Sequence, residues 1–140
     1  MRIFTDGGCR PSLNKGAIGI VYVKDGKVIY TYSKCYKGVT NNQMELLAIG
    51  KALDSIKKPI DSLEIISDSE YALGSIFKNW SGEKNRDLID KIKLKLGKVQ
   101  ELVSTPIKFS HVKGHQELDE GDAYFNNLAD KLCTKEMEYL

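Results

Sequence analysis

Hydrophobic positions in the first part of the chain recur at every second residue, which is the pattern of β-strands. Alternating segments cover residues 2–5, 17–23 and 27–36, and Asp25-Gly26 separates the last two. Glycine supplies the positive φ that a tight turn requires, so these two segments are predicted to form a β-hairpin. Asp6-Gly7-Gly8 follows the first segment and is predicted to be a turn.

From residue 42 the hydrophobic spacing changes to three and four residues, which is typical of helices. Leu46, Ile49 and Leu53 define one face of a helix predicted over residues 42–56, and Pro59 follows it. Further strands are predicted at 62–66 and 107–112, and further helices at 69–80, 86–103 and 125–138. The predicted order of elements is therefore βββαβααβα.

An antiparallel meander followed by strand–helix crossovers predicts a mixed sheet, because crossover helices of this length connect parallel strands. We expect an α/β fold with a five-stranded mixed sheet: three antiparallel strands, then parallel strands, with helices on both faces. The 140 residues suit one domain with a single core. No apolar run approaches the roughly 18 to 20 residues of a membrane span, so no membrane partner is expected.

Composition adds a charge asymmetry and a redox expectation. The chain has 21 basic and 19 acidic side chains, and 7 of the acidic ones but only 3 of the basic ones fall in residues 113–140. A basic body with an acidic end suits a polyanionic partner. Cys9, Cys35 and Cys133 are widely spaced, which argues against a disulfide framework or a cysteine zinc site. We therefore expect a reducing cytoplasmic location.

Four acidic residues lie at or near the ends of predicted elements. Asp6 ends the first strand, Glu45 lies in the first turn of the first helix, Asp68 ends the fourth strand, and Asp130 is on the last helix. If the first and fourth strands are parallel neighbours, both aspartates reach the sheet edge where ligands of open α/β sheets bind. Converging carboxylates favour Mg²⁺ or Mn²⁺, which prefer hard oxygen ligands.

Each acid taken alone also has a structural interpretation. Asp6 suits a turn, Glu45 suits a capping box with Asn42, and Asp68 lies in a helix-capping pattern. Asp130 suits a solvated helix face. Only the set of four indicates a site.

Two histidines near the fifth predicted strand receive different interpretations. His115 follows the strand in Val112-Lys113-Gly114-His115 and is a candidate proton shuttle beside the carboxylates. His111 lies inside the strand and is assigned a structural role. The acidic residues of segment 117–122 are interpreted as a solvated loop.

Six motifs, in this order, resemble the signatures of the type 1 ribonuclease H family, and together they extend over essentially the whole chain. They are Ile3-Phe4-Thr5-Asp6-Gly7-Gly8-Cys9, Thr40-Asn41-Asn42-Gln43-Met44-Glu45, Ile66-Ser67-Asp68-Ser69, Asn79-Trp80, Val112-Lys113-Gly114-His115 and Asn126-x-x-x-Asp130. The resemblance implies a ribonuclease H-like fold. It also implies an endonuclease that hydrolyses the RNA strand of an RNA–DNA hybrid and leaves 5′-phosphate and 3′-hydroxyl ends.

Carried over residue by residue, the resemblance implies that Asp6, Glu45, Asp68 and Asp130 bind two Mg²⁺ or Mn²⁺ ions, with Asp6 bridging them. Two metals can activate the attacking water on one side and stabilise the departing oxygen on the other. His115 is the mobile histidine that assists turnover. No protein nucleophile is required.

The same resemblance implies contacts to the hybrid. Neutral donors suit a minor groove that displays 2′-hydroxyls and base edges. Trp80 matches the aromatic residue that packs on DNA sugars, Thr40 and Asn85 match a DNA phosphate pocket, and Tyr71 lines the DNA channel. The implied substrate contacts are Thr40, Asn41, Asn42, Gln43, Tyr71, Trp80 and Asn85.

The chain also departs from many family members. Only residues 81–84 separate Trp80 from Asn85, where many members carry a long basic insertion. We also expect no separate hybrid-binding module before the first strand. We expect one catalytic domain over 1–140, acting as a monomer, with salt-sensitive hybrid binding. An accessory domain or protein that supplies further duplex binding stays an alternative. For the lysines 91, 95 and 98, a solvated helix face is favoured over phosphate contact.

Two other functions stay open at the sequence level. The first is a DNA-acting nuclease of the same fold, similar to integrases and resolvases, and the second is a non-catalytic nucleic-acid-binding domain. The Thr-Asn-Asn-x-x-Glu run and the Val-Lys-Gly-His turn favour the hybrid-cleaving enzyme over both.

Overall fold

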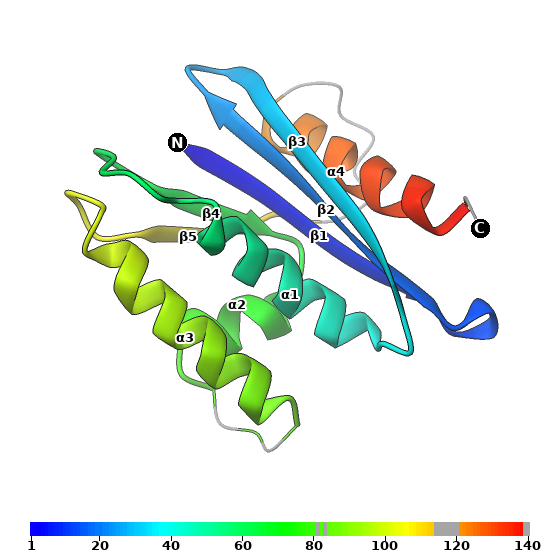
Figure 1. Ribbon diagram of the computed structural model, residues 1–140. Coiled ribbons are helices and arrows are strands. Elements are labelled where there is room, and N and C mark those ends of the chain that lie inside the picture. Colours follow the sequence, from blue (N-terminus) through cyan, green and yellow to red (C-terminus); the bar gives the residue numbers. More distant parts are fainter. Residues whose placement is uncertain (81, 83, 114–120, 139–140) are drawn as a thin grey trace.

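A single five-stranded sheet in the order β3-β2-β1-β4-β5 forms the centre of the molecule (Figure 1). The computed structural model describes residues 1–80, 82, 84–113 and 121–138. The strands are β1 (Arg2–Arg10), β2 (Lys15–Lys24), β3 (Lys27–Lys37), β4 (Glu64–Ser67) and β5 (Lys108–His111). The helices are α1 (Asn41–Asp54), α2 (Glu70–Phe77), α3 (Arg86–Gln100) and α4 (Gly121–Glu138), with a short 3₁₀ turn η1 (Pro11–Leu13).

Strand directions confirm the predicted mixed sheet. β1 pairs antiparallel with β2, and β2 pairs antiparallel with β3. β4 pairs parallel with β1 on one side and with β5 on the other. The first and fourth strands are therefore parallel neighbours, which is the arrangement that brings Asp6 and Asp68 to the same edge of the sheet.

The predicted turn at Asp6-Gly7-Gly8 is wrong, because β1 continues through it to Arg10. Its parallel pairing with β4 ends at Thr5 opposite Ser67, but its antiparallel pairing with β2 continues to Arg10 opposite Lys15. The chain reverses in η1 instead, where Asn14 adopts the left-handed conformation at φ 53°. Asp6 thus lies inside a strand, one residue beyond the last pair with β4.

Several helices begin or end at other residues than predicted. α1 begins at Asn41, because Thr40 and Gln43 form the capping box: the Gln43 N–H donates to Thr40 Oγ1 at 3.2 Å, and the Thr40 N–H donates to Gln43 Oε1 at 2.9 Å. The predicted capping role of Glu45 is therefore wrong. α2 ends at Phe77, since Asn79 takes a left-handed conformation, and α4 begins at Gly121, four residues earlier than predicted.

The two faces of the sheet carry separate hydrophobic layers, as the alternation of side chains along β1 requires. Ile3 packs in the larger layer with residues of α1, α2 and α3, whereas Phe4 packs with Ala129 of α4. Figure 1 shows α4 on the side of the sheet opposite α1. In the part of the chain that the structure describes, no helix combines the length and apolar character needed to cross a membrane.

Candidate active site

Asp6 occupies the centre of the candidate site. It lies on the central strand opposite Gly19 of β2, and only 4% of its surface is exposed. Beyond Thr5 the backbone of β4 turns away from β1, because Ser67 is the last residue of β4 and Asp68 begins the connection to α2. This divergence leaves room for side chains between the two strands.

Glu45 reaches Asp6 because α1 packs unusually close to β1. A Cβ atom on Gly7 would overlap the backbone of Met44 and Glu45, so only glycine permits this approach. The Gly7 N–H donates a hydrogen bond of 2.5 Å to Glu45 Oε1, which is buried with 6% of the residue exposed. Glu45 is therefore fixed beside Asp6 by a main-chain donor of β1.

The carboxylate of Asp68 can face the site because the next residue, Ser69, caps the helix that follows. Ser69 is the N-cap of α2, and its hydroxyl accepts from the Ala72 N–H at 3.1 Å. The Ser69 N–H in turn donates to Ser67 Oγ at 3.0 Å. The carboxylate of Asp68 is thus free of the capping role that the sequence pattern also allowed.

Asp130 comes from the opposite face of the sheet, on α4. A Cβ atom on Gly19, the β2 partner of Asp6, would overlap the main-chain oxygen of Ala129, so this glycine admits the α4 backbone next to β2. Asp130 lines the same cavity as Asp6, Glu45 and Asp68. The solvated-face interpretation of Asp130 is therefore wrong.

The four carboxylates share a cavity of about 290 Å³. One oxygen each from Asp6, Glu45 and Asp68 lie within 4.8 Å of one another. Burial, and then the charges of Asp68 and Asp130, raise the pKa of Asp6 to about 9. Burial and the charges of Asp6 and Asp68 likewise raise the pKa of Glu45 well above its ordinary value, against the lowering effect of the Gly7 N–H. Without a cation, burial and the neighbouring charges therefore disfavour the ionised forms of Asp6 and Glu45.

This donor set fits a hard divalent cation. Three carboxylate oxygens converge, and the raised pKa values of Asp6 and Glu45 show that uncompensated negative charge is unfavourable there. A cation such as Mg²⁺ or Mn²⁺ takes oxygen ligands and would offset that charge. The geometry therefore supports a divalent-metal centre that involves Asp6, Glu45 and Asp68, with Asp130 beside them.

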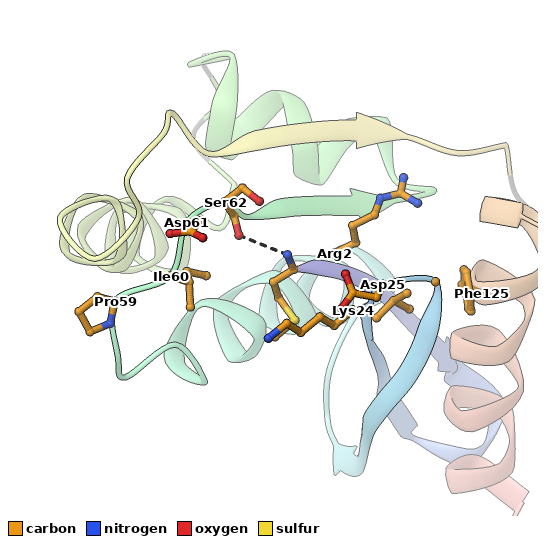
Figure 2. A pocket seen from close by; sticks show the side chains of 11 residues that line it. Arg2, Lys24, Asp25, Pro59, Ile60, Asp61, Ser62 and Phe125 are labelled. Carbon is orange, nitrogen blue, oxygen red and sulfur yellow. Dashed lines mark hydrogen bonds between the residues drawn. The ribbon is translucent and has the colours of Figure 1, made fainter.

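A larger cavity, of about 530 Å³, lies at the opposite end of β1. Figure 2 shows it between the β2–β3 turn and the segment that contains Ile60 and Asp61, with the amino group of Met1 hydrogen-bonded to the Ser62 oxygen at 3.4 Å. None of the four clustered carboxylates lines it. Cavity size therefore does not locate the candidate chemistry in this protein.

The residues expected to contact substrate lie in several places. Asn41 lines the carboxylate cavity, and Asn42 is exposed beside it at the start of α1. Thr40 and Gln43 form the capping box described above, which engages the Thr40 hydroxyl and the Gln43 side-chain oxygen.

The other expected contacts lie around α2. Asn85 Nδ2 donates to the hydroxyl of Tyr71 at 3.1 Å, so these two residues form one unit. Trp80 is 47% exposed, and its ring lies where a Cβ of Gly74 would be, with Lys78 Nζ 5.8 Å from the ring centroid. The tryptophan thus packs on α2 and still presents surface to solvent.

His115 and residues 117–120 lie outside the described residues. Asp122 is described, and it is in the first turn of α4 rather than in a solvated loop. Its carboxylate accepts two hydrogen bonds from the Arg2 guanidinium, at 2.7 and 2.9 Å. Lys95 forms an ion pair of 2.7 Å with Asp54 of α1, which ties it to the protein.

His111, to which the sequence analysis assigned a structural role, contacts the main chain of Asp68. Its side chain is 39% exposed, and Nε2 lies 3.1 Å from the main-chain oxygen of Asp68. The sequence signal for this contact was its place in the fifth predicted strand, which the structure pairs with the strand that precedes Asp68. That signal was weak, because the register of β4 and β5 does not follow from the hydrophobic pattern.

Comparison with known proteins gives one consistent result. The family model described as RNase H matches residues 1–138. A ribonuclease H of Clostridium botulinum strain Hall is 33% identical over 155 residues, which cover 97% of this chain and 94% of the relative. A ribonuclease H of Actinobacillus pleuropneumoniae is 34% identical, with 95% and 87% covered, and the ribonuclease HI of Haemophilus influenzae is 32% identical, with 99% and 90% covered.

Proposed function

Because the chain belongs to the RNase H family, we propose that it hydrolyses the RNA strand of RNA–DNA hybrids in the cavity formed by Asp6, Glu45, Asp68 and Asp130. The chain is a ribonuclease H, and therefore a hydrolase. The observation that carries the proposed site is the convergence of one oxygen each from Asp6, Glu45 and Asp68 within 4.8 Å. The proposed products carry 5′-phosphate and 3′-hydroxyl ends.

The proposed metal ligands are the four carboxylates of the cavity. Two divalent ions, Mg²⁺ or Mn²⁺, would lower the pKa of the attacking water and stabilise the departing 3′-oxygen. Asp6 lies on the central strand and interacts with each of Glu45, Asp68 and Asp130, which supports a bridging role for it. The Gly7 N–H keeps Glu45 oriented, so little reorganisation is required when a cation binds.

The proposed hybrid contacts extend from the cavity along α1 and α2. Asn41 lines the cavity and Asn42 adjoins it, which suits donors for the minor groove. Exposed Trp80 and the linked pair Asn85 and Tyr71 are the proposed contacts for the DNA strand, together with Thr40. His115 is proposed to assist turnover. We also propose that the chain acts as one catalytic domain.

A labelled RNA–DNA hybrid tests the proposal directly. We expect cleavage of the RNA strand with Mg²⁺ or Mn²⁺, none with EDTA, and a loss of at least about 100-fold in Asp68→Asn. Asp61→Asn is the matched control, since Asp61 lines the distant cavity and carries the same charge. His115→Ala should slow turnover without abolishing it.

Two outcomes would contradict the proposal. Full cleavage by Asp68→Asn would show that the metal-site assignment is wrong. Cleavage of a DNA–DNA duplex, with none of the hybrid, would show that the enzyme acts on a different substrate. Circular dichroism and thermal unfolding of each variant exclude loss of the fold as the cause.

A further inference from the structure

Three neighbouring strands carry a cation at the same end of the sheet, in direct register. Arg10 of β1 lies opposite Lys15 of β2, and Lys15 lies opposite Lys37 of β3. Residues in register project from the same face of a sheet, and like charges placed opposite each other are destabilising. We call Arg10, Lys15 and Lys37 the cationic row.

The cationic row is on the same face of β1 as Asp6. Side chains alternate along a strand, so Asp6, Gly8 and Arg10 point to one side. Gly8 has no side chain there, and a Cβ atom would come within 3.3 Å of Cys133 Sγ and of Met137 Cε on α4. Glycine thus leaves the space between Asp6 and Arg10 free of a β1 side chain.

The cavity extends from the carboxylates to Arg10, the first residue of the cationic row. Asp6, Gly8 and Arg10 all line it, with Thr134 and Met137 of α4 opposite. Four residues of strand separate Asp6 from Arg10 by about 13 Å, and the row extends a further 10 Å or so across β2 and β3. One nucleic-acid strand has a phosphate about every 3.4 Å of helix axis, so these spans correspond to several nucleotides.

We propose that the cationic row binds phosphates of the RNA strand a few nucleotides from the bond that is cleaved. This inference rests on the proposed function, because that function places the RNA strand in the carboxylate cavity. An RNA backbone that enters among four carboxylates meets repulsion, and adjacent cations offset it.

The salt dependence of hybrid binding tests the row. Binding is measured in an Asp68→Asn background, in which the hybrid stays intact, with the double variant Arg10→Gln/Lys37→Gln. Each lost phosphate contact should reduce the slope of log affinity against log salt by about 0.9, so we expect a reduction of about 1.8. If both proteins bind equally at about 1 M salt, this slope change corresponds to a roughly 60-fold loss of affinity at about 0.1 M salt.

Lys24→Gln/Lys27→Gln provides a matched control. These lysines lie opposite each other at the other end of β2 and β3, and their removal changes the net charge equally. We expect their slope to equal that of the parent. Equal reductions in both double variants would show that net charge, rather than the row, determines binding, and an unchanged slope in Arg10→Gln/Lys37→Gln would contradict the row directly.

A second measurement tests whether the cationic row binds the RNA strand of the hybrid rather than the DNA strand. Neutral methylphosphonate linkages, on 2′-O-methyl nucleotides, are placed in the RNA strand near the cleavage position, with 2′-O-methyl phosphate linkages as the control. They should weaken binding to the parent but not to Arg10→Gln/Lys37→Gln. The same effect from neutral linkages in the DNA strand alone would overturn the assignment. Absence of hybrid cleavage by the unchanged chain would instead contradict the proposed function.

Discussion

His111 at the end of β5 holds the main chain of Asp68: its Nε2 lies 3.1 Å from the Asp68 oxygen. A carbonyl oxygen only accepts, so Nε2 carries the hydrogen in this contact. Beside it, the Val112 N–H donates to the Ser67 oxygen at 3.0 Å. The connection that presents the Asp68 carboxylate is therefore fastened to β5 by two hydrogen bonds.

His111→Ala should weaken divalent-metal binding while leaving the fold intact. Loss of one partly exposed hydrogen bond costs about 1 kcal/mol of stability, whereas loss of a group that orients a ligand reduces metal affinity about tenfold or more. Mn²⁺ binding by calorimetry, with thermal unfolding alongside, measures both effects. His111→Gln, which retains a side-chain N–H donor, should recover most of the affinity.

Glu70→Gln is the control for that experiment. Glu70 Oε1 is 4.0 Å from His111 Nδ1, and its change removes a charge near the histidine but not the donor to Asp68. We expect nearly normal Mn²⁺ binding. If His111→Ala binds Mn²⁺ as tightly as the parent, the contact to Asp68 has no orienting role.

The metal-free protein should lose stability as the pH rises. The pKa of Asp6 is raised from 3.8 to about 9 by burial and by Asp68 and Asp130, so the folded state keeps a proton that the unfolded chain has released. This contribution is complete below about pH 4 and is lost as the pH approaches 9, by up to about 1.4 kcal/mol per pH unit. Thermal unfolding with EDTA between pH 5 and 9 measures the decline.

Asp6→Asn should reduce that decline, because the amide does not titrate. Added Mg²⁺ should stabilise the parent more at high pH, where it competes with fewer protons, and should have little effect on the variant. Asp25→Asn, in the exposed β2–β3 turn, should leave the pH dependence unchanged. A decline of equal slope in the parent and in Asp6→Asn would refute this account of the buried carboxyl.

Two glycine substitutions should have opposite effects on stability. In Gly7→Ala the new methyl group would overlap the α1 backbone at Met44 and Glu45, so the unfolding free energy should fall by about 2–3 kcal/mol. Gly97 lies inside α3 with no atom within 4 Å of the added methyl group. Gly97→Ala should therefore raise the unfolding free energy by up to about 1 kcal/mol.

Urea unfolding of both variants measures these changes, and Mn²⁺ titration reports the site. Gly7→Ala should also lose metal affinity, since the shift of α1 weakens the bond from the Gly7 N–H to Glu45. A Gly7→Ala variant with parental stability would mean that α1 can move away from β1 at no cost.

The parallel pairing of β1 with β4 was a condition of the argument for Asp6 and Asp68, and the structure establishes it. Hydrophobic periodicity was sufficient to predict the order of elements and a mixed sheet. It failed at Asp6, where Asp-Gly-Gly has turn composition but the pairing with β2 keeps the chain extended. It also failed at Glu45, since the capping box uses Thr40 and Gln43. A short stretch of sequence is often compatible with more than one local structure, such as a turn or a strand. Contacts with distant segments determine which of these structures forms.

The convergence of the carboxylates depends on packing that no periodicity records. Gly7 allows the backbone of α1 to approach β1, and Gly19 allows the backbone of α4 to approach β2. The need for glycine at each position is visible only in the folded structure. The bidentate pair between Arg2 and Asp122 is likewise a contact between residues 120 positions apart. Positions at the ends of predicted elements, and then the resemblance to a family, selected the four acids, whereas their proximity follows from these approaches.

The location of Asp6 inside β1 has a consequence for how the enzyme opens. β1 has a hydrogen-bonded neighbour on both sides as far as Thr5, so amides there exchange with solvent chiefly through global unfolding. Asp68 follows a four-residue strand and Asp130 is on a helix that covers the sheet, so both can be displaced by smaller openings. Local openings of the native enzyme should therefore displace Asp68 or Asp130 more readily than Asp6, whose strand keeps its pairing with β2.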